Sequence, residues 1–139
     1  MDKSSSVREA TLRLYQCMSS GDARGMERLF SHQLGVMGIG TDPNEWWAGH
    51  ETVVRMFATQ MQEMGGKMVV EAGDLAALAE GTVGWVADRP MFRTPDGAAM
   101  PCRITAVFRQ EDGDWKIVQM HASVGVSNVE VVGKELTTK

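Results

Sequence analysis

The chain has 139 residues, a net charge of −4 and a hydrophobic fraction of 43%. These values are typical of one globular domain, and the negative charge argues against binding to nucleic acid or to anionic membranes. No apolar stretch follows the charged N-terminus and none has the length of a membrane span, so the sequence predicts a cytoplasmic protein.

The first half of the chain predicts three helices. Ser6 and Glu9 form a candidate capping box for the first helix, and Asp22 is a good N-cap for the second. Between the second and third helices, a strand is expected over residues 33–40, followed by a turn-rich loop over 41–49. The helices are expected over residues 6–20, 22–30 and 50–64.

The second half of the chain predicts strands. The strongest signal is a hairpin over 102–123, in which Gly113 supplies the positive φ that a tight turn needs. Alternation places Cys102, Ile104, Met120 and their apolar neighbours on one sheet face, with Ile117 on the other. Earlier strands are expected over 67–72, 75–79, 82–88 and 91–93. Helices first and antiparallel strands later indicate an α+β fold, with three N-terminal helices packed on a strongly curved, mostly antiparallel sheet.

Several motifs resemble SnoaL-like members of the nuclear transport factor 2-like superfamily, which are cone-shaped α+β proteins. The resemblance covers about residues 7–126, leaving a flexible N-terminus over 1–6 and a polar tail over 127–139. It implies a cavity between the helices and the sheet, and a homodimer through the outer sheet face. The motifs are Gly21-Asp22, Gly38–Gly49 with its Trp46-Trp47 pair, Gly81–Val86, Arg103–Thr105, Asp112–Val118 and His121–Ser123.

The superfamily holds isomerases, cyclases, dehydratases, ligand carriers and dimerisation modules, so the fold does not choose among them. The comparison with ketosteroid isomerases implies that Asp42 lies near the position of the catalytic base and that Tyr15 matches the oxyanion-stabilising tyrosine. Cys102 stands where those enzymes carry a late-strand acid, and a thiol is a weak donor. The structural alternatives are that Asp42 opens a turn and that Tyr15 makes a buried hydrogen bond.

The expected ligand is a small, largely apolar organic molecule. Trp46 and Trp47 could form a lid over such a ligand, or one of them could plug the wide end of the cone. If the protein is an enzyme, the reaction is a proton transfer next to a carbonyl group that needs no cofactor. The residues expected to contact the ligand are Trp46, Trp47, Trp85, Met18, Phe57, Met61, Cys102, Ile104 and Met120.

A non-catalytic dimerisation or ligand-sensing module is the competing hypothesis. Arg103, His121 and Ser123 share the outward sheet face, where a dimer interface is favoured over a catalytic His–Ser pair because no nucleophile elbow is present.

His32 and His50 lack partners at metal-ligand spacing, so no metal is expected. Cys17 and Cys102 are expected to be buried thiols.

Overall fold

The computed structural model describes residues 1–66 and 68–139; Lys67, the expected start of one strand, lies outside them. Three helices and two sheets make up the domain, and a fourth, short helix follows the last strand. The elements in chain order are β1 (Asp2–Lys3), α1 (Ser5–Ser20), α2 (Ala23–Leu29), β2 (Met37–Ile39), β3 (Trp46–Ala48), α3 (His50–Glu63), β4 (Val69–Glu71), β5 (Ala76–Glu80), β6 (Val83–Asp88), β7 (Met91–Arg93), β8 (Ala99–Pro101), β9 (Arg103–Glu111), β10 (Asp114–Ser123) and α4 (Asn128–Val132).

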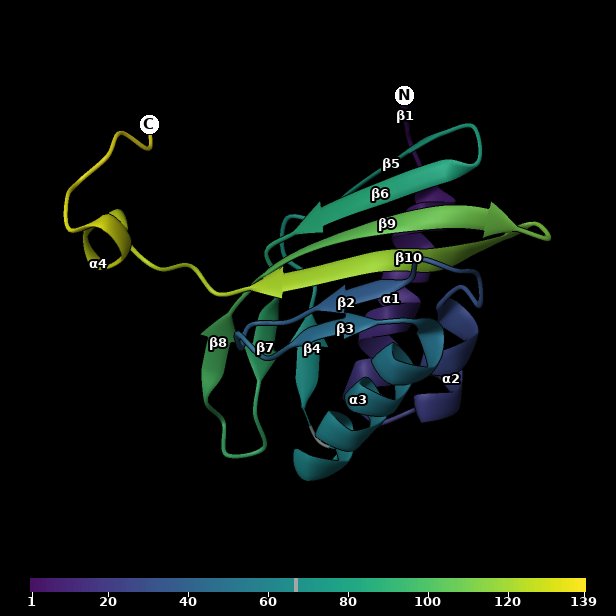
Figure 1. Cartoon of the computed structure of the whole chain (residues 1–139), viewed down its shortest axis with the longest axis horizontal. Helices are drawn as coiled ribbons and strands as arrows, with labels where there is room; N and C mark the ends of the chain where they lie inside the picture. The colour runs from purple at the N-terminus through teal and green to yellow at the C-terminus, as the bar shows by residue number, and fades with distance from the viewer. Residues whose placement is uncertain (67) are drawn as a thin grey trace.

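The larger sheet has seven strands in the order β1-β5-β6-β9-β10-β2-β3, and a three-stranded sheet has the order β4-β7-β8. Among the described strands, every pairing is antiparallel except that of β10 with β2. Figure 1 shows helices α1, α2 and α3 on one side of the curved larger sheet, while the chain beyond β10 leads away from the domain. The predicted α+β architecture is therefore confirmed. None of the described helices combines the length and apolar character of a membrane span.

The first helix starts earlier than the sequence analysis expects. Ser4 is its N-cap, and its side chain accepts a hydrogen bond from the backbone N–H of Val7. The predicted capping box at Ser6 is wrong, because the Ser6 hydroxyl instead accepts a hydrogen bond from Nε1 of Trp115 at 2.9 Å. This bond ties the start of α1 to β10, which packs the helix against the sheet.

The β9–β10 hairpin turns at Asp112 and Gly113, whose φ angles are +51° and +84°. Both central residues have positive φ, as a type I′ turn requires, so the predicted hairpin is confirmed. A β-bulge then shifts the register, since Ile117 pairs with Phe108 but Gln119 pairs with Val107. The extra residue reverses the alternation. The prediction that Ile117 faces outward is therefore wrong, and its side chain is fully buried.

The segment expected to be a loop contains the edge strand β3. Its residues pair with β2, so that Trp47 lies opposite Gly38 and Trp46 lies opposite Ile39. Successive side chains of a strand point to opposite faces. Trp47 is consequently buried, while Trp46 is 68% exposed.

Candidate functional site

A cavity of about 390 Å³ lies between helices α1 and α3 and the sheet faces turned toward them. Its volume falls within the range of about 300–1,000 Å³ that small-molecule sites occupy. Apolar side chains dominate the wall, and six of the lining residues are methionines. The lining residues are Met18, Ile39, Gly40, Thr41, Glu45, Trp47, Phe57, Gln60, Met61, Glu63, Met64, Met68, Phe92, Thr94, Met100, Cys102, Met120 and Ala122.

Six of the nine residues expected to contact a ligand line this cavity: Met18, Trp47, Phe57, Met61, Cys102 and Met120. The other three do not. Ile104 is buried in the core, and Trp46 points away from the cavity side of β3. Trp85 shares one face of β6 with the exposed Val83 and Ala87, so it lies on the outer sheet face rather than in the cavity.

Trp47 and Phe57 form an aromatic corner of the cavity. Their ring centroids are 5.5 Å apart and the planes meet at 83°, an edge-to-face arrangement. Such aromatic pairs stabilise the folded protein by about 0.5–1.5 kcal/mol beyond the contribution of the apolar area that they bury. Gly38 allows the tryptophan to lie there, because a Cβ at that position would come within 3.4 Å of its ring. The pair therefore gives one wall of the cavity a fixed, flat surface.

Glu45 and Glu63 are the carboxylates among the described residues that line the cavity, and the sequence analysis identified neither. Glu63 is exposed at the end of α3, whereas Glu45 is half-buried and held by hydrogen bonds. One oxygen accepts a hydrogen bond from Nε2 of Gln60 at 2.7 Å, and the other accepts one from the backbone N–H of Asp42 at 2.8 Å. A Cβ on Gly40 would come within 2.7 Å of this carboxyl group. The missing side chain at Gly40 and these hydrogen bonds together fix the position of the Glu45 carboxylate.

Asp42 occupies an exposed turn, and it is not among the described residues that line the cavity. Its own carboxylate accepts the backbone N–H of Asn44 at 2.8 Å, and its carbonyl oxygen accepts the N–H of Glu45 at 2.9 Å. These are the contacts that the structural alternative expects. The turn presents Glu45, rather than Asp42, to the cavity.

Tyr15 donates its hydroxyl hydrogen to Oδ2 of Asp88 at 2.8 Å, and both side chains are buried. Asp88 also accepts the backbone N–H groups of Arg89 and Gly73. Burial, followed by the hydrogen bond and negative charge of Asp88, raises the pKa of Tyr15 far above its usual range. Because a hydroxyl has one hydrogen to donate, Tyr15 clamps α1 to the end of β6 and has none left for an oxyanion.

Both cysteines are buried free thiols, as expected. Burial raises the pKa of the Cys102 thiol, so the cavity wall carries a neutral thiol at neutral pH. Cys102 therefore belongs to the apolar lining together with the methionines. It does not replace the acid of a ketosteroid isomerase.

The residues expected to face outward on the hairpin do so. Arg103 and Ser123 are paired in register, and Nε of Arg103 donates to the Ser123 hydroxyl at 3.2 Å. His121 is exposed on the same face. These three side chains thus lie on the side of the sheet opposite to the cavity.

Two signals in the sequence could have located the polar groups of the cavity. Gln60 lies in a stripe formed by Phe57 and Met61 on α3 and by Met64 at its C-cap, where a single polar residue interrupts apolar ones at helical spacing. Glu45 is two residues before Trp47, and it would share the inward face once this segment is treated as strand. The burial of Asp88 has no comparable signal in the sequence. Asp88 is followed by Arg89 at the end of a strand, and two charged residues at such a position usually indicate an exposed turn.

Fold and cavity together define a cone-shaped α+β protein with an apolar cavity between its helices and its sheets. The chain belongs to the SnoaL-like domain family, which matches residues 7–127. A protein of unknown function from Pseudomonas putida, of the nuclear transport factor 2-like class, is similar over 99% of both chains, with 19% identity and a TM-score of 0.81. No curated protein matches the sequence.

Two further solved structures have the same fold. A suggested dehydratase of the nuclear transport factor 2-like family from Streptomyces avermitilis has 20% identity and a TM-score of 0.77, over 88% of this chain and 95% of that one. A superfamily protein from Salmonella enterica has 18% identity and a TM-score of 0.76, over 92% of this chain and 93% of that one. At these identities the likeness establishes the fold alone.

Proposed function

We propose that the protein binds a small, largely apolar organic molecule in the cavity and that Glu45 exchanges a proton with it. The observation that carries this proposal is an apolar cavity of about 390 Å³ with a carboxylate held in its wall by hydrogen bonds. Burying an apolar ligand there removes its surface from water at about 25 cal/mol per Å². The cavity therefore favours apolar ligands, and Glu45 is the carboxylate that hydrogen bonds hold in its wall.

The lining favours ligands of more than one shape. Methionine side chains are unbranched and flexible, so a wall with six of them can adapt to the bound molecule. Trp47 and Phe57 add the flat surface on which a ring can lie. We infer that the substrate is a flat or ring-containing carbonyl compound.

The proposed chemistry is abstraction of a proton next to the carbonyl group of the ligand. Glu45 takes the proton and the ligand becomes an enolate. Return of the proton from Glu45 to another carbon of a conjugated enolate gives an isomer. Where the ligand carries a hydroxyl β to the carbonyl, its C–O bond breaks as the enolate collapses to a C=C bond, and the hydroxyl leaves as water with the proton from Glu45. A positioned carboxylate performs this step without a cofactor. The dehydratase description of the Streptomyces relative is compatible with it.

Two measurements test the proposal separately. Native mass spectrometry of the purified protein reports a retained molecule, and displacement of the dye anilinonaphthalenesulfonate by apolar ketones reports cavity binding. We expect Ala122→Phe, which fills the cavity wall, to abolish both. Dye binding that survives Ala122→Phe would place the dye outside the cavity and contradict the binding proposal.

Proton abstraction is followed by exchange of the ketone's α-hydrogens with deuterium from heavy water. We expect Glu45→Gln to slow the exchange by at least about 100-fold, the range in which general bases contribute. Asp42→Asn, in the same turn, is the matched control and should leave the rate unchanged. The reverse result would return the role of base to Asp42, as the sequence resemblance implies.

We also propose that the protein forms a homodimer through the outer face of the larger sheet, because this face leaves apolar side chains exposed or half-buried. Val83 is 45% exposed and Trp46 is 68% exposed. A row of paired residues also crosses five strands on this face: Leu78, Trp85, Val107, Gln119 and Met37. Exposed apolar surface of this kind favours association with a second copy. Sedimentation velocity tests the proposal, and a monomer at micromolar concentration would contradict it.

A further inference from the structure

Glu27, His32 and His50 gather at one end of the helical layer, away from the cavity. Glu27 lies on α2, His32 follows that helix, and His50 begins α3. One ligand atom from each side chain lies within 4.8 Å of the others. The imidazole rings are stacked, with centroids 3.7 Å apart and an angle of 26° between planes. The two histidines are far apart in sequence, which is why their spacing gave no metal signal.

The orientation of His50 is set by a rigid partner. Its Nδ1 lies 2.8 Å from the carbonyl oxygen of Ser31, which can only accept, so Nδ1 carries the hydrogen and leaves the Nε2 lone pair free. Ser31 is itself fully buried: its N–H donates to Ile117 at 2.9 Å and its hydroxyl donates to Glu111 at 2.6 Å. A ligating histidine usually makes this kind of hydrogen bond through its other ring nitrogen.

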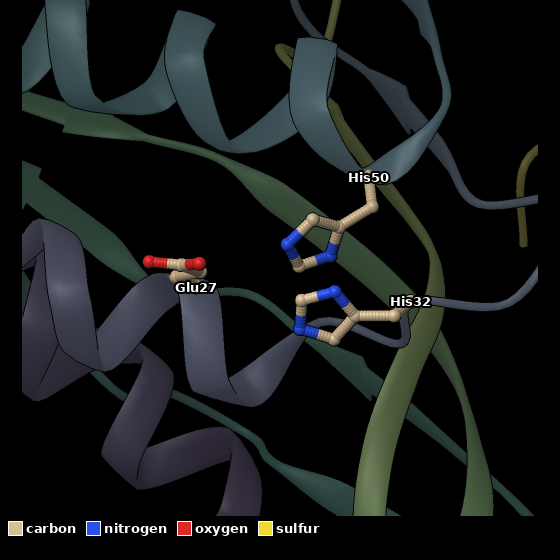
Figure 2. Close-up of side chains that lie close together, drawn as sticks. All are labelled: Glu27, His32 and His50. Atoms are coloured by element: carbon tan, nitrogen blue, oxygen red, sulfur yellow. The ribbon is translucent and has the colours of Figure 1, made fainter.

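Figure 2 shows that the two rings present their Nε2 edges to the side on which the Glu27 carboxylate lies. Within the part of the chain that the structure describes, no hydrogen bond or ion pair links these three side chains to one another. Glu27 and His32 are exposed and His50 is half-buried. Three groups that can ligate a metal therefore converge without bonding to one another.

We propose that Glu27, His32 and His50 bind a divalent first-row transition ion, with Zn²⁺ as the preferred ion. Two imidazole nitrogens and one carboxylate oxygen suit Zn²⁺, at distances of about 2.0–2.2 Å, whereas Ca²⁺ and Mg²⁺ prefer oxygen ligands. The positive end of α3 opposes a cation at His50, and the charge of Glu27 offsets it. Water completes the coordination, because the site is open to solvent.

The ion would join the end of α2 to the start of α3. Phe57, the first residue of α3 that lines the cavity, is seven residues beyond His50, about 10 Å along the helix, and none of the three proposed ligands is among the described residues that line the cavity. The proposal does not depend on ligand binding in the cavity. Its expected consequence is structural: the ion binds the folded chain and raises the melting temperature.

Titration of the metal-free protein with Zn²⁺ in a calorimeter is the first test. We expect one ion per chain, and we expect Glu27→Gln and His32→Ala each to weaken binding at least about tenfold. His121→Ala is the matched control, because His121 is the remaining histidine and lies on the outer sheet face. Absence of saturable binding, equal binding by the ligand variants, or loss of binding in His121→Ala would overturn the proposal.

A second measurement needs no variant and so does not depend on how the variants fold. Nuclear magnetic resonance of the ring nitrogens distinguishes the three histidines, His32, His50 and His121, in the wild-type protein. Zn²⁺ should shift the Nε2 signals of His32 and His50 and leave those of His121 in place. Shifts confined to His121, or no shifts at all, would show that the cluster is not the binding site.

Discussion

Removing the hydroxyl group of Tyr15 tests the buried clamp between α1 and β6. The Tyr15–Asp88 hydrogen bond is 2.8 Å long and both partners are buried, so Tyr15→Phe should cost about 1.5–3 kcal/mol, the range for hydrogen bonds to charged groups. Asp88 keeps its two backbone donors, Arg89 and Gly73, which limits the loss. For a chain of this length the change lowers the melting temperature by roughly 6–12 °C.

The same residue gives a pH dependence with a definite sign. Burial and Asp88 raise the pKa of Tyr15 in the folded state, whereas the unfolded chain releases this proton near pH 10. Below about pH 10 the tyrosine is protonated in both states and its stabilising contribution is complete. Above that pH the unfolded state alone is ionised, and folding stability falls by about 1.4 kcal/mol per pH unit. Wild type and Tyr15→Phe should therefore converge in stability as the pH rises.

Urea unfolding at a series of pH values, followed by circular dichroism, measures this convergence. Thr11→Val is the control, since it removes a buried hydroxyl that donates to the Val7 carbonyl but does not titrate in this range. Tyr15 is the one tyrosine in the sequence, so tyrosinate absorbance reports it directly. Reversible appearance of tyrosinate near pH 10 in protein that is still folded would refute the reasoning.

Three further predictions concern the cavity and the outer sheet face. Gly40→Ala places a Cβ within 2.7 Å of the Glu45 carboxyl group and should slow deuterium exchange of a bound ketone at least about tenfold. Gly125→Ala, which meets no atom within 4 Å, is the control and should leave the exchange unchanged. Met120→Ala removes a fully buried side chain from the cavity wall and should cost about 2–5 kcal/mol in urea unfolding; a cost under about 1 kcal/mol would mean that the wall collapses to fill the space. Val107→Glu, on the outer face of β9, should convert the proposed dimer to monomers in sedimentation velocity, whereas Leu12→Glu on α1 should leave its mass unchanged. A Val107→Glu variant that sediments like wild type would move the interface elsewhere.

The order of helices and strands could be predicted because local patterns determine it. The stripe of α1, the Gly65-Gly66 stop after α3 and the Asp112-Gly113 turn each act over a few residues. The β10 bulge could not be predicted in this way. A single extra residue at Val118 reverses which side chains face the core, and nothing in strict alternation marks where the register shifts.

The candidate site was predicted in its apolar part and missed in its polar part, and the reason is physical. Apolar residues such as Met61 and Met120 reveal their burial by spacing within one element. The carboxylate of Glu45 reaches the cavity only because a turn, a short edge strand and a side chain from α3 meet around it. The directions of the Trp46 and Trp47 rings could not be predicted for a similar reason. In a loop the sequence does not determine where either ring points, whereas in a strand the two rings point to opposite faces.

Strand β3 therefore places the residues of the two proposed activities on opposite faces. Trp47 lines the cavity, as does Glu45 just before the strand, whereas Trp46 lies on the apolar outer face that we propose for dimerisation. A substitution of Trp46 should accordingly alter association without altering ligand binding, and a substitution of Trp47 should do the reverse. The separation follows from the alternation of a strand, and it allows the enzyme hypothesis and the interaction hypothesis to be tested independently in one protein.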